Sequence, residues 1–500
     1  MTNIKEYNCH YCESEYEYAF IGFLETEGWK YTSGNKLSRV TKRDVLIEDD
    51  FKKFIADGNP DLTEDEVTQI YDTIRLVGAE SDFATLHKVY NWMVDGIQFT
   101  PKDGIARMIP LINFEKDGVK NIFRVVNQFT VEYTNNGQKE NRRPDVILFV
   151  NGMPLCIMEL KNPADANATI YDAWEQINIR YWRDIPHLLH YCPLACISDG
   201  VKTRLGTVRT PYEHFYAWRR VNDGDVVSTL PFAETETMIK GVYSPERFLE
   251  IFRDYIYFQD SIYDSDEVEI VCRYPQFFAA RLLKQSIVDS VVTKSGRGGT
   301  YFGATGCGKT YTMAFLARQL ALRCTDISEI GSPTIILIVD RDELQKQGAK
   351  LFTKSTEFLN LGEVSVVKNR AQLRQELGAR QSGGFYICTI QKFCDREDDK
   401  IGLINDRQNI ICFSDEAHRT QLEHSKKIQF SKDADANMKA MVSKPYAKVL
   451  KEAFPQATFV GFTGTPIAET YQTFGDEIDR YTMDQAVADG LTVSIKYHPR

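Results

Sequence analysis

The segment from 303 to 310 contains the residue types that bind phosphate groups. It reads Gly-Ala-Thr-Gly-Cys-Gly-Lys-Thr and matches G-x-x-x-x-G-K-[S/T], a loop whose backbone N–H groups surround a nucleotide's phosphates. The ammonium of Lys309 would reach the β- and γ-phosphates, and the Thr310 hydroxyl would hold Mg²⁺. The periodicity after Thr310 predicts a helix whose N-terminus adds a favourable dipole. The alternative is an ordinary glycine-rich turn. The segment predicts ATP binding by Gly303, Ala304, Thr305, Gly306, Cys307, Gly308, Lys309 and Thr310.

Asp145, Glu159 and Lys161 form a second group that could do chemistry. They lie on two apolar runs that read as a hairpin. A three-residue turn at 151–153 places position 145 opposite 159, whereas a two-residue turn places the two carboxylates on opposite faces. If they meet, they can hold Mg²⁺, and Lys161 can position or help deprotonate the water that hydrolyses a phosphodiester. The alternative is a surface salt bridge on a hairpin.

Composition indicates a soluble globular protein with roughly three domains. The 500 residues are 43% hydrophobic and 26% charged, and no apolar run is as long as a membrane span. The N-terminus has no signal-peptide pattern. Eleven cysteines without a framework spacing favour a reducing cytoplasm. Cys9 and Cys12 hint at a metal, but with no second ligand pair nearby, incidental cysteines are favoured.

The net charge of −10 argues against a surface that coats polyanions in general. Local basic clusters occur at Asn141–Arg143, Arg180–Arg183, Lys202–Arg209 and Arg219–Arg220. Each cluster alone favours a solvated surface over a DNA groove.

Within the first 160 residues the hydrophobic periodicity changes from that of helices to that of strands. Helices are expected at 13–27, 62–77 and 81–95, the second with a capping box from Thr63 to Glu66. A strand is expected at 123–133, followed by a turn at 135–137 and by the hairpin strands 145–150 and 154–161.

The hairpin motif resembles the core of the PD-(D/E)xK nucleases. It reads Arg143-Pro144-Asp145 and Glu159-Leu160-Lys161, and the surrounding 160–165 and 197–200 segments resemble the restriction (R) subunit of type I restriction–modification enzymes. That family often carries Q-x-x-x-Y on the helix after the lysine. Here Gln176 and Tyr181 are the matching nuclease-associated residues, but they are five apart, with Arg180 at the expected position. Residues five apart do not share a face of an α-helix as residues four apart do.

Beyond the P-loop, strands and helices alternate. Apolar strands are expected at 334–339, 385–389, 410–414 and 457–462, and the strand before the P-loop has only the short signal Thr300-Tyr301-Phe302. This rhythm predicts a parallel sheet in an α/β RecA-like domain. Ligands of such sheets bind at the carboxyl ends of the strands.

Polar residues at these strand ends resemble the motifs of superfamily 2 helicases. Asp415-Glu416-Ala417-His418 resembles the DEAH motif, in which Asp415 holds Mg²⁺ and Glu416 orients or deprotonates the attacking water. Gln276, after Tyr274-Pro275, resembles the glutamine that reads adenine, although a solvent-facing glutamine is the alternative. The resemblance implies that the residues coupling ATP to DNA are Arg341, Gln391, Lys392, His418, Thr463 and Thr465.

The resemblance implies an α/β chain with a PD-(D/E)xK nuclease domain, a mixed sheet with flanking helices, followed by a RecA-like parallel-sheet P-loop domain. We expect the nuclease domain at 1–240, an acidic connector at 241–270 and the ATPase domain at 271–490. Residues 491–500 would begin the linker to a second RecA-like domain, which makes the chain the N-terminal part of a larger subunit.

The implied function is that of an ATP- and Mg²⁺-dependent endonuclease that translocates double-stranded DNA and cuts it away from the recognition site. Its partners would be modification (methyltransferase) and specificity subunits, in the cytoplasm and without a membrane. Two alternatives stay open. One is an ATP-dependent repair nuclease-helicase that acts on DNA ends. The other is a non-catalytic module in which ATP only switches DNA binding.

Overall fold

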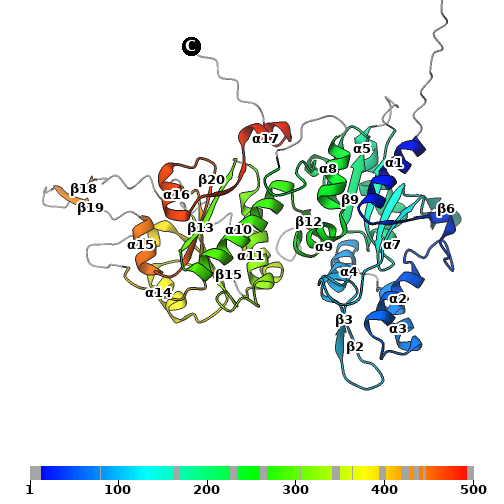
Figure 1. Cartoon of the computed structure of the whole chain (residues 1–500), viewed down its shortest axis with the longest axis horizontal. Helices are drawn as coiled ribbons and strands as arrows, with labels where there is room; N and C mark the ends of the chain where they lie inside the picture. Colours follow the sequence, from blue (N-terminus) through cyan, green and yellow to red (C-terminus); the bar gives the residue numbers. More distant parts are fainter. Residues whose placement is uncertain are drawn as a thin grey trace, which may run out of the picture. The chain divides into compact units, whose positions relative to one another are not determined.

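The computed structural model describes residues 13–78, 80–162, 169–225, 233–259, 267–304, 306–339, 350–362, 364–393, 401–417, 428–432, 438–442 and 446–492. The chain divides into two compact units, Met1–Val271 and Cys272–Arg500 (Figure 1). Each unit has its own sheet, and each is described by itself.

A mixed six-stranded sheet forms the centre of the first unit. Its order is β1–β4–β7–β8–β9–β10. The pairs β1–β4 and β8–β9 are parallel and the other three pairs are antiparallel. Every residue of β7, β8 and β9 is buried, as expected of strands that are covered on both faces. The strands are β1 (Lys30–Ser33), β4 (Phe123–Asn127), β7 (Val146–Val150), β8 (Met153–Leu160), β9 (Leu194–Ser198) and β10 (Thr203–Thr207).

The β7–β8 hairpin turns through two residues. Asn151 and Gly152 both have positive φ, 51° and 77°, the combination of a type I′ turn. The ladder closes directly across them, because Val150 pairs with Met153. The expected three-residue turn at 151–153 was therefore wrong.

A β-bulge in the same hairpin restores the expected pairing. The register shifts by one residue in the middle of the ladder, which leaves Leu155 as an extra residue on β8. Beyond the bulge, Val146 pairs with Met158. Positions 145 and 159 therefore follow opposite each other, as a three-residue turn would have placed them.

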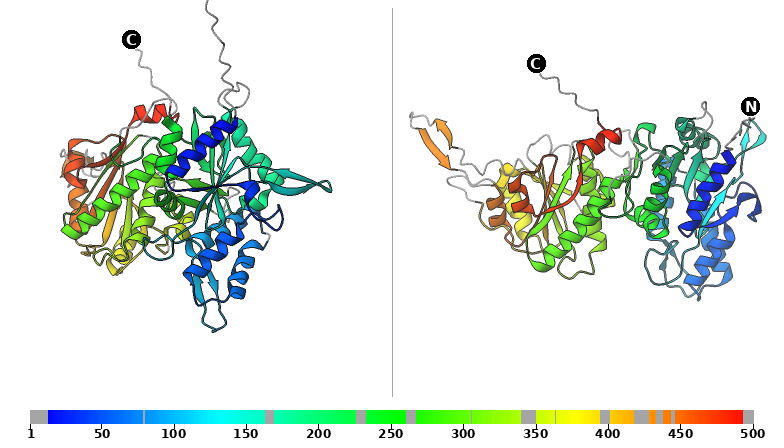
Figure 2. Two further views of the ribbon diagram at one scale, coloured as in Figure 1. Left: turned by 45° about the vertical axis from the view of Figure 1, so that its right-hand side comes forward. Right: turned by 45° about the horizontal axis from the view of Figure 1, so that its top comes forward.

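The expected strand at 123–133 is broken in the structure. Gln128 adopts a left-handed backbone with φ 52°, and its N–H donates to the Asp145 carbonyl at 3.0 Å. The chain then leaves the sheet, and β5 (Val131–Asn135) pairs with β6 (Gln138–Arg142) as a separate hairpin. This hairpin projects beyond the sheet in the left view of Figure 2.

The helices of the first unit confirm the expected capping box. Thr63 N–H donates to Glu66 Oε2 at 2.8 Å, and Glu66 N–H donates to Thr63 Oγ1 at 3.4 Å. The helices are α1 (Glu13–Thr26), α2 (Glu48–Gly58), α3 (Glu64–Arg75), α4 (Asp82–Asp95), α5 (Ile170–Glu175), the π-helix η2 (Gln176–Tyr181), α6 (Trp182–Asp184), α7 (Pro186–Leu189), α8 (Ala233–Val242) and α9 (Pro245–Asp254), with short turns η1 (Gly34–Lys36) and η3 (Tyr212–His214). Two further hairpins are β2 (Ile97–Phe99) with β3 (Arg107–Ile109) and β11 (Ile256–Gln259) with β12 (Val268–Val271).

The second unit is built on a parallel sheet of seven strands. Its order is β15–β16–β14–β17–β20–β13–β21, and all neighbours run parallel. The four strands expected beyond the P-loop are all present, and the strand before it is seven residues long. The strands are β13 (Arg297–Gly303), β14 (Thr334–Val339), β15 (Val364–Val366), β16 (Phe385–Thr389), β17 (Ile410–Asp415), β20 (Thr458–Thr463) and β21 (Glu477–Tyr481).

Helices cover the parallel sheet on both faces (Figure 1). On one face, Ile336 and Ile338 of β14 pack in one buried cluster with Leu373, Leu377 and Phe454. The helices are α10 (Tyr274–Thr293), α11 (Lys309–Arg323), α13 (Thr356–Leu359), α14 (Arg370–Ala379), α15 (Tyr446–Ala453), α16 (Ala468–Phe474) and α17 (Met483–Ala488), with the turn η4 (Ile390–Phe393) and a separate hairpin of β18 (Ile428–Lys432) and β19 (Met438–Val442). None of the helices in the described ranges is long and apolar enough to cross a membrane.

Candidate functional site

The carboxylates of Asp145 and Glu159 lie at one end of the β7–β8 hairpin. Val146 pairs with Met158, so the preceding and following positions lie opposite each other on the same face of the sheet. The Leu160 N–H donates to Asp145 Oδ2 at 2.9 Å and ties Asp145 to the strand that carries Glu159. The fold therefore brings the two acids together.

Glu159 is fully buried. Its Oε1 accepts a hydrogen bond from the Tyr181 hydroxyl at 2.6 Å. Its Oε2 accepts no hydrogen bond from the described residues and lies 3.8 Å from Lys161 Nζ. Burial, with the neighbouring Asp145 carboxyl, raises the pKa of Glu159 well above its usual range, while Lys161 and Tyr181 oppose that rise.

A closed ring of polar contacts joins Glu159 to Lys161, Gln176 and Tyr181, and we call it the Glu159 ring. Lys161 Nζ donates to Gln176 Oε1 at 3.0 Å, and Gln176 Nε2 donates to the Tyr181 hydroxyl at 2.8 Å. Tyr181 in turn donates to Glu159, which lies beside Lys161. The ring fixes both the ammonium and the buried carboxyl relative to the hairpin.

A π-helical turn explains how residues five apart can meet. The segment Gln176–Tyr181 is π-helical, with the i→i+5 pattern of that helix rather than the i→i+4 pattern of an α-helix. The expectation that this spacing separates the two side chains is therefore wrong here. Arg180, at the position where four-residue spacing would place the tyrosine, is exposed and pairs with Glu175 at 2.6 Å.

Three further residues near this site have contacts that were not predicted from the sequence. The indoles of Trp174 and Trp182 and the carboxamide of Asn178 all donate hydrogen bonds to the loop after β10. Their signal in the sequence is a spacing of four between side chains that carry N–H donors, which places them on one side of a helix.

The donor set around Glu159 fits a hard cation such as Mg²⁺. Two carboxylates meet, and one buried oxygen, Glu159 Oε2, accepts no hydrogen bond within the described part of the chain. A buried acceptor without a partner costs stability, which a bound cation would offset. No group of three or more His, Cys, Asp and Glu side chains gathers among the described residues. Mg²⁺ suits such a sparse set, because it commonly binds one or two carboxylates and keeps waters or phosphate oxygens.

The P-loop follows β13, between the sheet and α11. Gly306 and Gly308 have φ of 83° and 85°, a backbone that favours glycine. A Cβ on Gly308 would lie 2.4 Å from Gln276 Nε2, so a side chain at this position would displace the Gln276 carboxamide. Lys309 begins α11, and its Nζ donates to the Gly303 carbonyl at 3.2 Å. Among the other predicted residues, Ala304 and Cys307 are buried and Thr310 is half-buried.

Asp415 and Glu416 lie at the carboxyl end of β17, within reach of Lys309. Lys309 Nζ is 3.8 Å from Glu416 Oε1. Burial raises the pKa of Asp415 to about 6, while Lys309 opposes the rise. Glu416 has a left-handed backbone with φ 50°, and its N–H donates to Asp415 Oδ1 at 3.0 Å. Such strain at a non-glycine residue persists where the surroundings enforce it, often at functional sites.

Gln276 is buried beside the P-loop rather than facing solvent. Its Oε1 accepts a hydrogen bond from the Arg273 N–H at 2.9 Å, and its Nε2 donates to the Gly308 carbonyl at 3.4 Å. The carboxamide therefore links the start of α10 to the P-loop.

The other predicted residues lie at the same edge of the parallel sheet where the structure describes them. Gln391 and Lys392 follow β16, and Lys392 Nζ donates to Thr389 Oγ1 at 3.2 Å. Thr463 ends β20 and is buried, and its Oγ1 accepts from the Thr465 N–H at 3.1 Å. Thr305, Arg341 and His418 lie outside the described residues.

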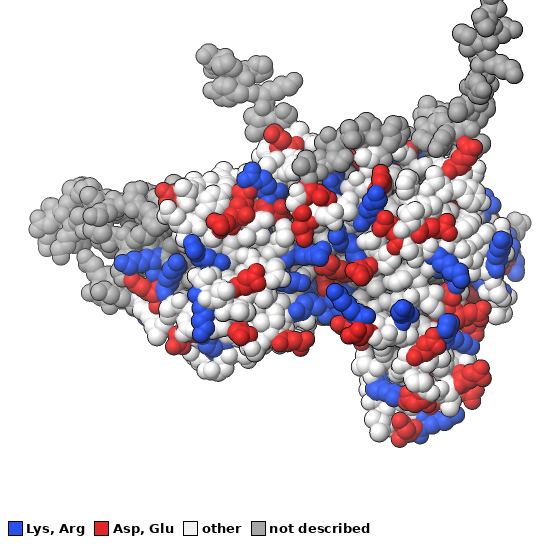
Figure 3. All heavy atoms as spheres, in the orientation of Figure 1, with Lys and Arg blue, Asp and Glu red and all other residues white. Residues whose placement is uncertain are grey.

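Several arginines of the predicted basic clusters have acidic partners. On the face shown in Figure 3, acidic and basic side chains are interspersed. In the basic clusters, several arginines make ion pairs. These are Arg142 with Asp184, Arg183 with Asp184, Arg204 and Arg219 with Glu234, and Arg209 with Glu267. These pairs agree with an ordinary surface for the first three clusters, whereas Arg220 is buried, so the expectation of a solvated surface was wrong for Arg219–Arg220.

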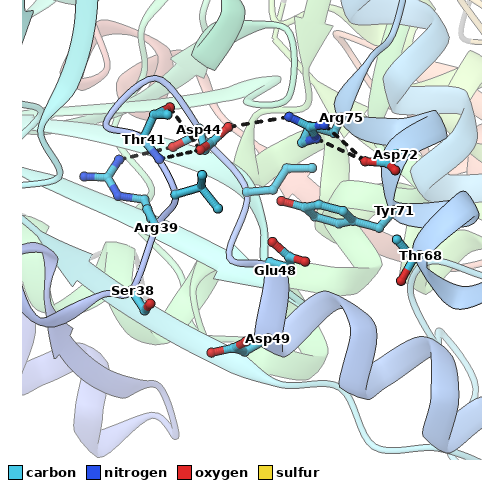
Figure 4. A pocket seen from close by; sticks show the side chains of 12 residues that line it. Ser38, Arg39, Thr41, Asp44, Glu48, Asp49, Thr68, Tyr71, Asp72 and Arg75 are labelled. Carbon is cyan, nitrogen blue, oxygen red and sulfur yellow. Dashed lines mark hydrogen bonds and ion pairs between the residues drawn. The ribbon is translucent and has the colours of Figure 1, made fainter. Parts of the chain in front are cut away.

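A separate hollow of about 300 Å³ lies between the loop 38–49 and α3. Figure 4 shows Arg75 between Asp44 and Asp72, at 3.8 and 3.2 Å. The hollow also contains Glu48 and Asp49, so its carboxylates outnumber its guanidiniums. A hollow with surplus negative charge disfavours phosphate groups, and we assign no DNA contact to it.

Two family models match the chain in succession. Residues 11–214 match "Type I restriction enzyme R protein N terminus", and residues 275–500 match "SWI2/SNF2 ATPase". The first match includes the Glu159 ring, and the second includes the P-loop and the Asp415–Glu416 pair.

Curated relatives match nearly the whole chain. It is 30% identical to the endonuclease subunit of the type I restriction enzyme HindI of Haemophilus influenzae, over 97% of this chain and 46% of that protein. It is 30% identical, with the same two coverages, to an endonuclease subunit from Methanocaldococcus jannaschii. The chain thus spans about half the length of these relatives. A fragment of an HsdR subunit from Vibrio vulnificus aligns at 16% identity over 73% of this chain and 56% of that one, with a TM-score of 0.27, too low to carry an argument about the fold.

Proposed function

Because the chain is similar along 97% of its length to endonuclease (R) subunits of type I restriction enzymes, we propose that it is the nuclease-and-motor part of such a subunit. It hydrolyses ATP to move duplex DNA and cuts that DNA away from the recognition site. The observation that carries the proposal is the order of two chemistries in one chain. A carboxylate–lysine site on a mixed sheet precedes a P-loop site on a parallel sheet.

In the nuclease site, Asp145 and Glu159 hold Mg²⁺. When bound, the ion supplies a more acidic water and neutralises charge on the phosphate. Lys161 positions the attacking water and helps to remove its proton. Gln176 and Tyr181 hold Lys161 and Glu159 in place. Their hydrogen bonds of 2.6 to 3.0 Å support this role.

In the motor site, the backbone of residues 303–310 surrounds the phosphates of ATP. Lys309 contacts the β- and γ-phosphates, and Thr310 and Asp415 hold Mg²⁺. Glu416 orients the water that attacks the γ-phosphate, a role supported by its 3.8 Å approach to Lys309. Gln276 contacts adenine from beside the P-loop. Coupling to DNA falls to Arg341, Gln391, Lys392, His418, Thr463 and Thr465.

The assembly around the chain follows from the same proposal. Duplex DNA is the substrate, and modification and specificity subunits of the same system supply site recognition in the cytoplasm. We place the nuclease domain at residues 1–240, the connector at 241–270 and the ATPase domain at 271–490.

Cleavage of circular DNA tests this proposal. A circle has no ends, so a repair nuclease-helicase that needs ends leaves it intact, whereas a type I enzyme cuts it. The complex with the modification and specificity subunits should linearise a circle carrying the recognition site only with ATP and Mg²⁺. Equal cleavage without ATP, or cleavage of linear DNA alone, contradicts the proposal.

A further inference from the structure

Three side chains fasten η2 to the loop that follows β10. Trp174 Nε1 donates to the Thr210 carbonyl at 2.9 Å, and Trp182 Nε1 donates to the Val208 carbonyl at 2.7 Å. Asn178 Nδ2 lies between them and donates to both carbonyls, at 3.0 Å each. Each carbonyl oxygen therefore receives two donors, one for each lone pair. We name Trp174, Asn178 and Trp182 the carbonyl clamp.

The carbonyl clamp and the Glu159 ring both draw side chains from this one helical segment, but at different residue spacings. The three clamp residues are four apart, a spacing that an α-helix places on one face. Gln176 and Tyr181 are five apart, and an α-helix would separate them by roughly 140° around its axis. The π-helical turn satisfies both requirements, with the clamp on the loop and the Gln176–Tyr181 contact at 2.8 Å.

Tertiary contacts, rather than the helix propensity of its own residues, hold the π-helical turn. π-helical turns are rare and occur frequently at functional sites. The residues that complete the extra length, Ile179 and Arg180, are exposed, so packing of the added residue does not account for the turn. Asn178 Oδ1 is buried and has no hydrogen-bond partner among the described residues. The two hydrogen bonds of Asn178 Nδ2 therefore hold the turn at the cost of one unpaired carboxamide oxygen.

We propose that Asn178 is a positioning residue of the nuclease site. By bridging two carbonyls it holds the turn in which Gln176 reaches Lys161 and Tyr181 reaches Glu159. The hydrogen bonds of Asn178 go to the two carbonyls and not to the carboxylates or the lysine, so it acts through the two residues that contact them. This inference rests on the proposed nuclease function.

Asn178→Ala is the direct test. In the complex with its modification and specificity subunits, cleavage of circular DNA should fall about tenfold or more in kcat with little change in KM for DNA, as is typical when partners of a metal ligand lose their position. Mg²⁺ titrated calorimetrically into the 500-residue chain should bind more weakly, and ATP turnover should stay unchanged. Arg180→Ala, in the same turn but exposed and paired with Glu175, is the control and should cleave within about twofold of wild type.

A double-mutant cycle with Tyr181→Phe separates positioning from general damage. If Asn178 acts through Tyr181 and Gln176, the loss of cleavage in the double variant is smaller than the product of the two single losses. Wild-type cleavage by Asn178→Ala, or a multiplied loss in the double variant, overturns the inference. If Asn178→Ala does not fold, Trp182→Phe replaces it, because this variant removes one hydrogen bond of the clamp. The inference then requires a smaller loss of cleavage, and wild-type cleavage overturns it. Asp145→Ala keeps the two hypotheses apart, because cleavage by that variant contradicts the nuclease function itself.

Discussion

At the scale of single residues, two acids with raised pKa values mark the two sites. Burial raises the pKa of Glu159 well above its usual range and that of Asp415 to about 6, and in each case a lysine opposes the rise. Lys161 lies 3.8 Å from Glu159, and Lys309 lies 3.8 Å from the Glu416 next to Asp415. Acids perturbed in this way, each with a specific cationic partner, concentrate at functional sites.

Lys161 tests the chemistry of the nuclease site. Lys161→Ala should abolish DNA cleavage but leave Mg²⁺ bound, because the two carboxylates remain. Lys161→Arg should also fail, because a guanidinium cannot accept a proton at working pH and does not match a point-charge site. Cleavage assays and calorimetric Mg²⁺ titration measure the two effects, with the exposed Lys202→Ala as control. Cleavage by Lys161→Ala would show that the lysine is only structural.

Lys309 tests the motor site in the same way. Lys309→Ala should lower ATP turnover to background, because the contact with the γ-phosphate is lost, and ATP-dependent cleavage should fall with it. Lys448→Ala, an exposed lysine of α15, should turn over ATP as wild type does. Unchanged turnover in Lys309→Ala would remove the motor interpretation.

At the scale of elements, some features could be predicted from the sequence and others could not. The strands β14, β16, β17 and β20 were predictable because each is an apolar run with a polar residue after it. The fold class followed from them. The bulge at Leu155 was not predicted, although Pro154 beside it lacks the N–H that a regular ladder needs and is a residue typical of bulges.

The geometry of the candidate nuclease site depends on such features. The sequence named Asp145 and Glu159 but proposed the wrong turn, and it placed Gln176 and Tyr181 on different helix faces. A spacing of five is incompatible with an α-helix, and only the tertiary contacts of the carbonyl clamp indicate that the helix widens. Which residues take part was readable from types and spacing, whereas how they meet was not.

The β5–β6 turn, in which Asn136 and Gly137 have φ of 48° and 79°, is also type I′ and allows a matched test of the β7–β8 hairpin. Gly152 and Gly137 have similar φ, 77° and 79°, but a Cβ at 152 would lie 2.2 Å from the Ile47 carbonyl oxygen, whereas at 137 nothing lies within 4 Å. Gly137→Ala should cost about 1–2 kcal/mol through backbone strain alone. Gly152→Ala should cost about 1–3 kcal/mol more, as in other overpacked sites. Denaturant unfolding measures both, and equal costs would contradict the described contact.

His187 on α7 predicts a pH dependence of the first unit. Burial lowers its pKa from 6.5 to about 4, and Arg43 and His190 add to the effect. Between pH 6.5 and 4 the unfolded chain therefore binds a proton that the folded chain does not, and stability falls as the pH falls. The loss is at most about 3 kcal/mol, since one pKa unit corresponds to about 1.4 kcal/mol. Unfolding of His187→Phe should depend less on pH over this range than that of wild type; identical slopes would contradict the shift.

At the scale of the whole molecule, the two units carry the two candidate sites in a fixed order. The first unit contains the Glu159 ring and the second contains the P-loop, and neither site borrows a residue from the other unit in the interactions described above. The two family models match the chain in the same order, one in each unit, and the curated relatives are about twice as long. The exact domain limits at 240 and 270 remain a prediction. We predict that DNA cleavage can be removed without loss of ATP turnover, whereas loss of ATP turnover also stops ATP-dependent cleavage.

The most direct test measures ATP turnover and cleavage of circular DNA on the same preparation of the Asp145→Ala complex. Asp145 shares no ligand with the nucleotide, so the variant should hydrolyse ATP at the wild-type rate and leave the circle uncut. Lys309→Ala serves as the opposite reference and should lose both activities. If Asp145→Ala still cuts DNA, the hairpin is structural and the nuclease assignment is wrong. If it loses ATP turnover instead, the two chemistries are not separate.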